Sequence, residues 1–449
     1  MTKRPVGAIT RPVKQGRRGT EAREGADALS SLRFLPHHDR PAALGEIHSR
    51  PFPVITSNRV ILHFAFTSEG GAQVSQAVLA ELCRSRGETV PANGARYHEM
   101  NWGNGRLRWE RHSEFTTYLW EGPLPKGFLD PVANTPFGGS FSQPGMLISA
   151  SRVEIRPLTP ANIKLLKSFD PESLCVTLLE DGVSMLATDF RQDGNGMTVF
   201  LLLEKAMAPS RIGYFAKTAI DVETYRTLAL LGLPLAQSLS ARLASFEAEL
   251  ARLTSQMRAI NSDSVRPLLD AMTDLASELE ADAAASLFRF GATRAYGDIV
   301  NERLGVLGQA APSGYKNIGS FLELRLGPAL RTCRSVEDRQ ANLSRKLSRA
   351  ANLLRTRVEV DIEHQNRNLL ESMNKRAMLQ LRLQQTVEGL SVAAVSYYIA
   401  GLIYYLMQAA EHHLPFGLSS KAATGLFVPV IIVAVWLLVR RIRRRHKAD

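Results

Sequence analysis

The sequence predicts an α+β cytoplasmic domain, followed by an all-α stalk of long helices and a C-terminal transmembrane hairpin of two helices. Three observations support this fold class. Residues 31–220 contain short apolar runs that alternate with polar positions, as strands do. From Asp221 the apolar residues recur about every 3.6 positions, which is the period of a helix. Residues 390–410 and 422–439 are apolar, and each segment is long enough to cross about 30 Å of hydrocarbon.

The positive charge of the chain is concentrated at its two ends. The formal net charge is +12; residues 1–25 hold seven Lys or Arg and two Glu, and residues 440–449 hold six Lys or Arg and one Asp. A nucleic-acid-binding surface needs basic residues clustered on a folded face, so we expect no nucleic-acid partner. Residues 1–30 are predicted to be a disordered basic tail, with anionic lipid as an alternative ligand. Residues 440–449 are predicted to be a basic cytoplasmic tail.

The domain over residues 31–220 is predicted from strand-like segments separated by turn residues. Val60–Phe66 is typical of a strand, and Ala72–Arg86 of a helix that follows a Gly-Gly break. One long strand is expected over Arg106–Glu121, with His112 and Glu114 on the same face. Further strands are expected at Met146–Arg156, Val176–Leu179, Ser184–Phe190 and Met197–Leu203, the last two joined by a hairpin turn over residues 193–196.

Residues 221–389 are predicted to form the helical stalk. Asp221–Leu253 is expected to be helical, with Pro234 kinking or dividing it. The stalk helix is expected to begin near Ser335 and to continue into the apolar segment, which gives a helix of about 105 Å over residues 340–410. Shorter helices are expected at Ser264–Phe288, Gly291–Gly305 and Ser320–Ala329.

An apolar stripe follows one face of the stalk helix. Its mean spacing over residues 343–373 is 3.75 positions. That spacing exceeds the 3.5 of a left-handed coiled coil, so we expect nearly straight or slightly right-handed packing. Because such a stripe packs against neighbouring helices, it predicts a homo-oligomer formed through the stalk and the first apolar segment. Its members are Leu343, Leu347, Ala350, Leu354, Val358, Ile362, Gln365, Leu369 and Met373.

The lipid bilayer is an expected partner of the two apolar segments. The charges beside these segments predict the orientation of the protein in the bilayer. Six Lys or Arg follow the second segment, whereas the turn between the segments has one Lys, one Glu and two His. The positive-inside bias therefore places both termini in the cytoplasm. The first 30 residues lack the apolar core of a secretory signal peptide. The three widely spaced cysteines also fit a reducing compartment.

The first apolar segment is more polar than a simple anchor requires. Tyr397, Gly401, Tyr404 and Gln408 share one helix face. One interpretation is helix–helix packing, in which glycine allows close approach and polar tips form hydrogen bonds between helices. The other is the lining of a pore in an oligomer, with residues 411–413 at its outer mouth. Neither segment contains the Arg or carboxylate that an ion relay usually shows.

No motif assigns a catalytic or cofactor site. The sequence lacks an HExxH motif, a cysteine pair, a P-loop, a dinucleotide-binding fingerprint and a G-x-S-x-G motif. His112 and Glu114 are candidates for acid–base catalysis or metal binding, and His48 is a further catalytic candidate. The alternative for His112 and Glu114 is a hydrogen-bonded sheet face. His37-His38-Asp39 could also supply ligands, so an enzymatic activity and its cofactor stay open.

Cys333 lies between basic residues, which raises a separate question of reactivity. Arg331 and Arg334 flank it, and guanidinium groups near a thiol favour the thiolate. The alternative is an incidental thiol on a helix surface.

Six segments of the chain together carry a resemblance to a known family. They are Gly45–Phe52, Arg108–Tyr118, Asp221–Leu235, Phe288–Tyr296, Leu330–Val336 and Leu381–Tyr398. These segments resemble an uncharacterised proteobacterial family of membrane-anchored proteins, domain of unknown function 3422, and the resemblance extends from about residue 40 to the second apolar segment. It implies a bacterial inner-membrane protein with two C-terminal spans and no assigned activity, and it transfers no catalytic residue.

A second resemblance concerns architecture alone. A cytoplasmic domain, long stalk helices and two C-terminal spans are similar to CorA-type magnesium channels, but the Gly-Met-Asn motif of that family is absent from the end of the first segment, residues 405–410. Three functions therefore stay open. The first is an oligomeric interaction or scaffold protein, the second a CorA-like channel or transporter, and the third a membrane-tethered metal-dependent enzyme.

Overall fold

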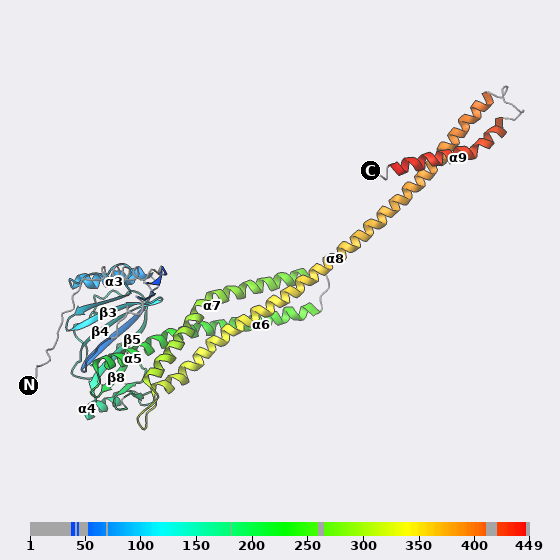
Figure 1. Ribbon diagram of the computed structural model, residues 1–449. Coiled ribbons are helices and arrows are strands. Elements are labelled where there is room, and N and C mark those ends of the chain that lie inside the picture. The colour runs from blue at the N-terminus through cyan, green and yellow to red at the C-terminus, as the bar shows by residue number, and fades with distance from the viewer. Residues whose placement is uncertain are drawn as a thin grey trace, which may run out of the picture. The chain divides into compact units, whose positions relative to one another are not determined.

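The computed structural model describes residues 37–40, 43–44, 53–68, 71–180, 182–258, 265–409 and 420–445 (Figure 1). The chain divides into two compact units, with boundaries after Leu250, Asp274 and Lys346. The first unit contains the sheet and the helices packed on it. The second contains the ends of two helices, residues 251–274, together with the chain from Leu347 onward. The predicted order of a sheet region followed by long helices is confirmed.

One mixed sheet of eight strands organises the first unit. Its order is β2-β3-β4-β1-β5-β8-β7-β6, and neighbouring strands are antiparallel except β5 and β8. The strands predicted near residues 60, 146, 176, 184 and 197 are confirmed as β1 and β5 to β8. The strands are β1 Arg59–Thr67, β2 Tyr97–Trp102, β3 Gly105–Arg111, β4 Phe115–Pro123, β5 Leu147–Pro157, β6 Cys175–Leu178, β7 Met185–Thr188 and β8 Thr198–Glu204.

The prediction of one strand over residues 106–121 is wrong. This segment forms a hairpin, in which Arg106 of β3 lies opposite Glu121 of β4 and Arg111 lies opposite Thr116. Residues 112–114 connect the two strands, so His112 lies in a turn and not on a strand face. The turn contains no Gly, Pro, Asn or Asp, the residues that usually mark such a break. The alternating pattern also continues on both sides, so the sequence gives no indication of the reversal.

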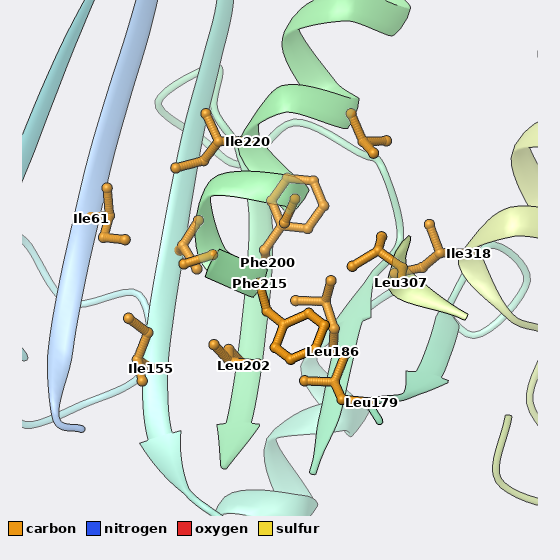
Figure 2. Packing of buried hydrophobic residues seen from close by; sticks show 14 of the residues in the cluster. Ile61, Ile155, Leu179, Leu186, Phe200, Leu202, Phe215, Ile220, Leu307 and Ile318 are labelled. Carbon is orange, nitrogen blue, oxygen red and sulfur yellow. The ribbon is translucent and has the colours of Figure 1, made fainter. Parts of the chain in front are cut away.

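Helices cover the two faces of the sheet. Helix α3 (Gly71–Ser85) covers one face, where its apolar side chains join a core with β1 and β3. Helix α5 (Pro209–Leu230) covers the other, and Figure 2 shows Phe215 of this helix with Phe200 and Leu202 of β8 in the buried cluster. The short helices α4 (Pro160–Ile163) and η1 (Lys164–Ser168) follow β5. Because both faces are covered, central strand β8 is buried along its whole length.

The helix that was expected to begin at Asp221 begins earlier and ends earlier. Helix α5 starts at Pro209, runs through residue 220 and packs on the sheet, and α6 (Gly232–Arg258) follows it directly. The division therefore lies at Leu231 and Gly232, with Pro234 tolerated in the first turn of α6. A Cβ on Gly232 would lie 2.3 Å from the hydroxyl oxygen of Thr293, so the close approach of two helices requires glycine there.

The later helices are longer than their sequence patterns indicate. Helix α7 (Val265–Leu307) contains both segments predicted between residues 264 and 305. Helix α8 (Ile318–Ala409) is continuous for 92 residues, passes through Pro328 and includes the stalk and the first apolar segment. Its length is about 138 Å at 1.5 Å per residue. Helix α9 (Ser420–Arg445) follows.

Two of these helices are long and apolar enough to cross a membrane. They are α8, through its C-terminal part, and α9 over residues 424–441. Only 6% and 17% of the residues in their apolar windows are buried, whereas a core helix of a soluble protein would be mostly buried. Both helices therefore fit a membrane location.

Candidate functional site

A cavity of about 400 Å³ lies in the first unit, where the β3–β4 turn faces α5 and α7. Its polar lining comes from Arg96, Arg111, His112 and Ser113. Its aromatic lining comes from Phe115 of β4, Tyr225 of α5 and Tyr296 of α7. The site is thus built from the segment before β2, the β3–β4 hairpin and two helices, which are far apart in the sequence.

The aromatic side chains form a continuous cluster. The rings of Tyr225 and Tyr296 stack with their centroids 5.6 Å apart, at an interplanar angle of 26°. Phe115 meets both rings edge-on, at 6.0 and 6.4 Å. Offset-stacked and edge-to-face pairs are favourable arrangements of aromatic rings, so this surface is well ordered.

His112 joins this cluster from the turn. Its ring stacks on Phe115 with the centroids 4.2 Å apart, at an angle of 10°. Its Nε2 atom lies 3.7 Å from a carboxylate oxygen of Glu110, and both side chains are only 12% exposed. The sequence prediction that His112 belongs to a site is consistent with its place in the cavity wall, although the predicted strand geometry was wrong.

Glu114 has a different environment from His112. Its carboxylate forms an ion pair with Arg289 of α7 and accepts a hydrogen bond of 2.7 Å from the hydroxyl group of Tyr296. Both contacts attach the hairpin turn to α7. Glu114 therefore does not form a donor pair with His112 on a common strand face, and its contacts favour a structural role.

Close to the cavity lies a partly buried ionisable cluster that was not predicted from the sequence. His63 of β1 is 2% exposed, and its pKa is lowered well below 6.5 by burial and by the charges of Lys217 and His112. Its imidazole is therefore neutral at pH 7. Lys217 of α5 forms an ion pair of 2.5 Å with Asp221, whose other oxygen lies 3.4 Å from the Nε atom of Arg303.

The protonation of Lys217 follows from this network. Burial by itself lowers its pKa, but the nearby Asp221 and Glu110 carboxylates outweigh burial and raise the pKa above its ordinary value. Lys217 is thus a cation with a side chain 23% exposed, close enough to the neutral His63 to lower its pKa. The sequence contains one indication of this cluster, since His63 interrupts an otherwise apolar strand. The position of Lys217 was not predictable in this way, because the helix that holds it was expected to begin after it.

A metal site at His112 and Glu114 is not favoured by this arrangement. Within the described parts of the chain, His37, His38 and Asp39 form the one group of at least three donor residues whose ligand atoms lie within 4.8 Å of one another. All three are exposed, and Asp39 lies 2.9 Å from Nε2 of His38. His48 lies outside the described residues.

Cys333 is neither a surface thiol nor a reactive one. It is 2% exposed, and burial raises the pKa of its thiol. The helical period places Arg331 and Arg334 on the exposed side of α8, away from the thiol. Cys83 and Cys175 are also buried, and all three are free.

The polar face of the first apolar segment is left largely uncovered. Tyr397 is 78% exposed and Gln408 is exposed, whereas Gly401 and Tyr404 are partly buried. Within the same segment, the polar residue Ser396, which is not one of these four, is buried at 6% exposure. The choice between helix packing and a pore stays a prediction.

Comparison with protein families gives a match over most of the chain. A family model described as "Protein of unknown function (DUF3422)" matches residues 35–446, which include the sheet, the cavity and both apolar helices. No curated protein matches the sequence. Neither result supports the architectural likeness to CorA-type channels.

Proposed function

Because the chain belongs to the DUF3422 family of proteins of unknown function, we propose its function from geometry: it is a membrane-anchored protein that assembles with copies of itself through α8 and presents its sheet domain in the cytoplasm. Helices α8 and α9 support the anchor, since each is long and apolar enough to span a bilayer.

One observation carries the proposed assembly. Along the apolar stripe, Leu347 and Leu354 are each 1% exposed, but Ile362, Leu369 and Met373 are 52–59% exposed. In the second unit, the guanidinium group of Arg357 donates to the carbonyl oxygen of Met257, close to the end of α6. The stripe therefore continues beyond the helices that cover it. Large exposed apolar surfaces of this kind mark interaction sites.

A second copy of the same helix fits this stripe better than lipid does. Residues 359–388 contain nine Asp, Glu, Lys or Arg, so this part of α8 is too charged to lie within a bilayer. Copies anchored in one membrane have the same orientation, so their α8 helices run parallel. In a symmetric parallel pair, each stripe residue lies opposite its own copy.

The test uses single-cysteine variants of the full-length protein in its membrane. The native cysteines are buried, which keeps the background low. Leu369→Cys and Met373→Cys should give disulfide-linked dimers under mild oxidation. Arg367→Cys, on the opposite helix face, is the control and should give much less. Equal cross-linking at all three positions, together with a monomeric size in detergent, would contradict the assembly.

Orientation is tested separately from assembly. The basic residues that follow the second apolar helix support a cytoplasmic C-terminus. A fluorescent reporter fused after Asp449 should be active, and an alkaline phosphatase fused at the same place, which requires the periplasm, should be inactive. The reverse pattern would overturn the proposed topology in the bacterial inner membrane.

A channel is the second candidate, favoured by the exposure of Tyr397 and Gln408 on the first apolar helix. In reconstituted vesicles, such a channel would conduct cations, and Gln408→Leu and Tyr404→Leu would change the flux. Absence of flux under every ion gradient would end this proposal, without affecting the assembly.

A further inference from the structure

The lining of the β3–β4 cavity combines cationic groups with an aromatic surface. Arg96, Arg111 and His112 contribute guanidinium and imidazole groups, and Ser113 contributes a hydroxyl. Among the described residues that line the cavity there is no carboxylate. We propose that this cavity binds a small organic anion, in which a carboxylate or phosphate group is attached to a planar apolar body.

The neighbouring carboxylates are already engaged with cations or donors. Glu114 is held by Arg289 and the Tyr296 hydroxyl, and Asp221 by Lys217 and Arg303. Glu110, which is outside the lining, lies 3.7 Å from Nε2 of His112 and also acts on Lys217. The carboxylates near the cavity therefore have cationic or donor groups beside them. An entering anion meets guanidinium groups, which bind carboxylate and phosphate through paired hydrogen bonds.

The aromatic cluster supplies the complementary apolar surface. Tyr225 and Tyr296 stack on each other, and their contacts with Phe115 hold their rings in place. The Tyr296 hydroxyl is fixed by Glu114, so this ring has one preferred position. A volume of about 400 Å³ lies in the range of small-molecule sites, and it suits a ligand with one ring.

Two other cavities of the first unit lack this combination. The one of about 640 Å³ has Lys167 and Lys316 in its lining but also Glu172. The one of about 260 Å³ has Arg226 and Arg325 but also Asp189. An anion would meet a carboxylate in either place. The β3–β4 cavity is therefore the better site for an anion.

Isothermal titration of the full-length protein in detergent tests the proposal with four probes. Benzoate and phenyl phosphate carry both features and distinguish a carboxylate from a phosphate ligand. Benzamide has the ring without the charge, and acetate has the charge without the ring. At least one aromatic anion should bind saturably. Benzamide should bind at least about tenfold more weakly because it lacks the charge-assisted hydrogen bonds, and acetate at least about tenfold more weakly because it lacks the ring that packs on the aromatic lining. Binding of benzamide as tight as that of benzoate and phenyl phosphate, or saturable binding of neither anion, would overturn the proposal.

Variants locate the binding in this cavity. Arg96→Gln and Arg111→Gln should each weaken binding of the aromatic anion about tenfold, because each removes one cationic donor. Arg191→Gln is the control, since this arginine is 62% exposed and lies outside the cavity lining. Arg111 also donates to the carbonyl oxygen of Gly94, so unchanged circular dichroism is required of that variant. Arg96 is exposed and provides the test if Arg111→Gln fails to fold.

A second measurement does not depend on the titration. A ligand in this cavity contacts the hairpin turn and two helices together, so it should raise the thermal midpoint of the wild type, and the shift should grow with the logarithm of one plus the ratio of ligand concentration to Kd. The same ligand should shift the midpoint of the Arg96→Gln variant less. Wild-type affinity in both arginine variants would contradict the site even if self-association through α8 is confirmed.

Discussion

The sheet and the distal part of α8 differ in whether their apolar side chains are buried. The sheet buries apolar residues on both faces and also buries charged ones, such as Glu154 at 0% exposure between Arg152 and Arg156. Helix α8 beyond residue 358 leaves apolar residues exposed, among them Leu369 and Leu370. The sheet covers these apolar residues and pairs Glu154 within the chain. The distal part of α8 leaves its apolar residues uncovered, and this difference indicates that it is the region that needs contact with another molecule.

The largest effect is expected from Glu154→Ala. This carboxylate accepts hydrogen bonds from both Arg152 and Arg156, which also donate to backbone carbonyls of residues 127–130. Its removal leaves two buried guanidinium groups without their anion, and the cost should be about 3–5 kcal/mol. Denaturant unfolding followed by tryptophan fluorescence measures it. As a control, Glu180→Ala removes an exposed partner of Arg211 and should cost less than about 1 kcal/mol.

A pair of leucine variants compares the covered and uncovered parts of the same stripe. Leu354→Ala should destabilise the protein by about 2–5 kcal/mol at any protein concentration, because it leaves a cavity in a buried position. Leu369→Ala should matter only when copies associate, so its effect on the thermal midpoint should grow with protein concentration. Equal, concentration-independent losses in both variants would remove the distinction between the two parts.

The buried cluster near the cavity predicts a pH dependence. The pKa of His63 is lowered on folding, so the unfolded chain binds more protons than the folded protein below pH 6.5. Stability should therefore fall as pH decreases from about 7 towards the folded pKa, by up to about 1.4 kcal/mol per pH unit from this group. Thermal midpoints between neutral and mildly acidic pH measure the slope. His63→Gln should flatten it, and an unchanged slope would assign the dependence to other groups.

The smallest effect is expected on the charged face of α8. Lys375 lies 3.0 Å from Glu371, and both side chains are more than 60% exposed. Such a pair on a helix contributes about 0.3–0.5 kcal/mol, so Lys375→Ala should barely change the thermal midpoint. It should also leave the cross-linking at Leu369→Cys intact. A large loss of either would mean that charged pairs, and not the apolar stripe, hold copies together.

Secondary structure was predictable where a local pattern determines it. The strand near Val60 and the helix near Ala72 were found because apolar spacing and a Gly-Gly break are local features. The hairpin over residues 105–123 was missed because its turn, His112-Ser113-Glu114, has Ser113 as its one turn-favouring residue and contains no Gly, Pro, Asn or Asp. Helices α7 and α8 were predicted as shorter pieces, whereas α7 is continuous over Val265–Leu307 and α8 over Ile318–Ala409.

The cavity was only partly predictable. His112 was named as a candidate from its residue type and lies in the cavity lining. Tyr225, Tyr296 and Lys217 were not named, because nothing in the sequence places α5 and α7 beside the β3–β4 turn. Glu114 was found but given the wrong neighbour. Its contact with Arg289 joins residues that are far apart in the chain, and such contacts depend on how helices cross a sheet.

By itself, the sequence determined the order of a sheet region and long helices, the two apolar helices near the C-terminus and the family. These features depend on local periodicity, hydropathy and contiguous motifs. The tertiary structure alone decided which residues surround the cavity, that Cys333 is buried, and that the apolar stripe of α8 is covered at Leu354 but not at Leu369. The stripe has the same residue types at both places. Only the position where the neighbouring helices end makes one part a core and leaves the other exposed.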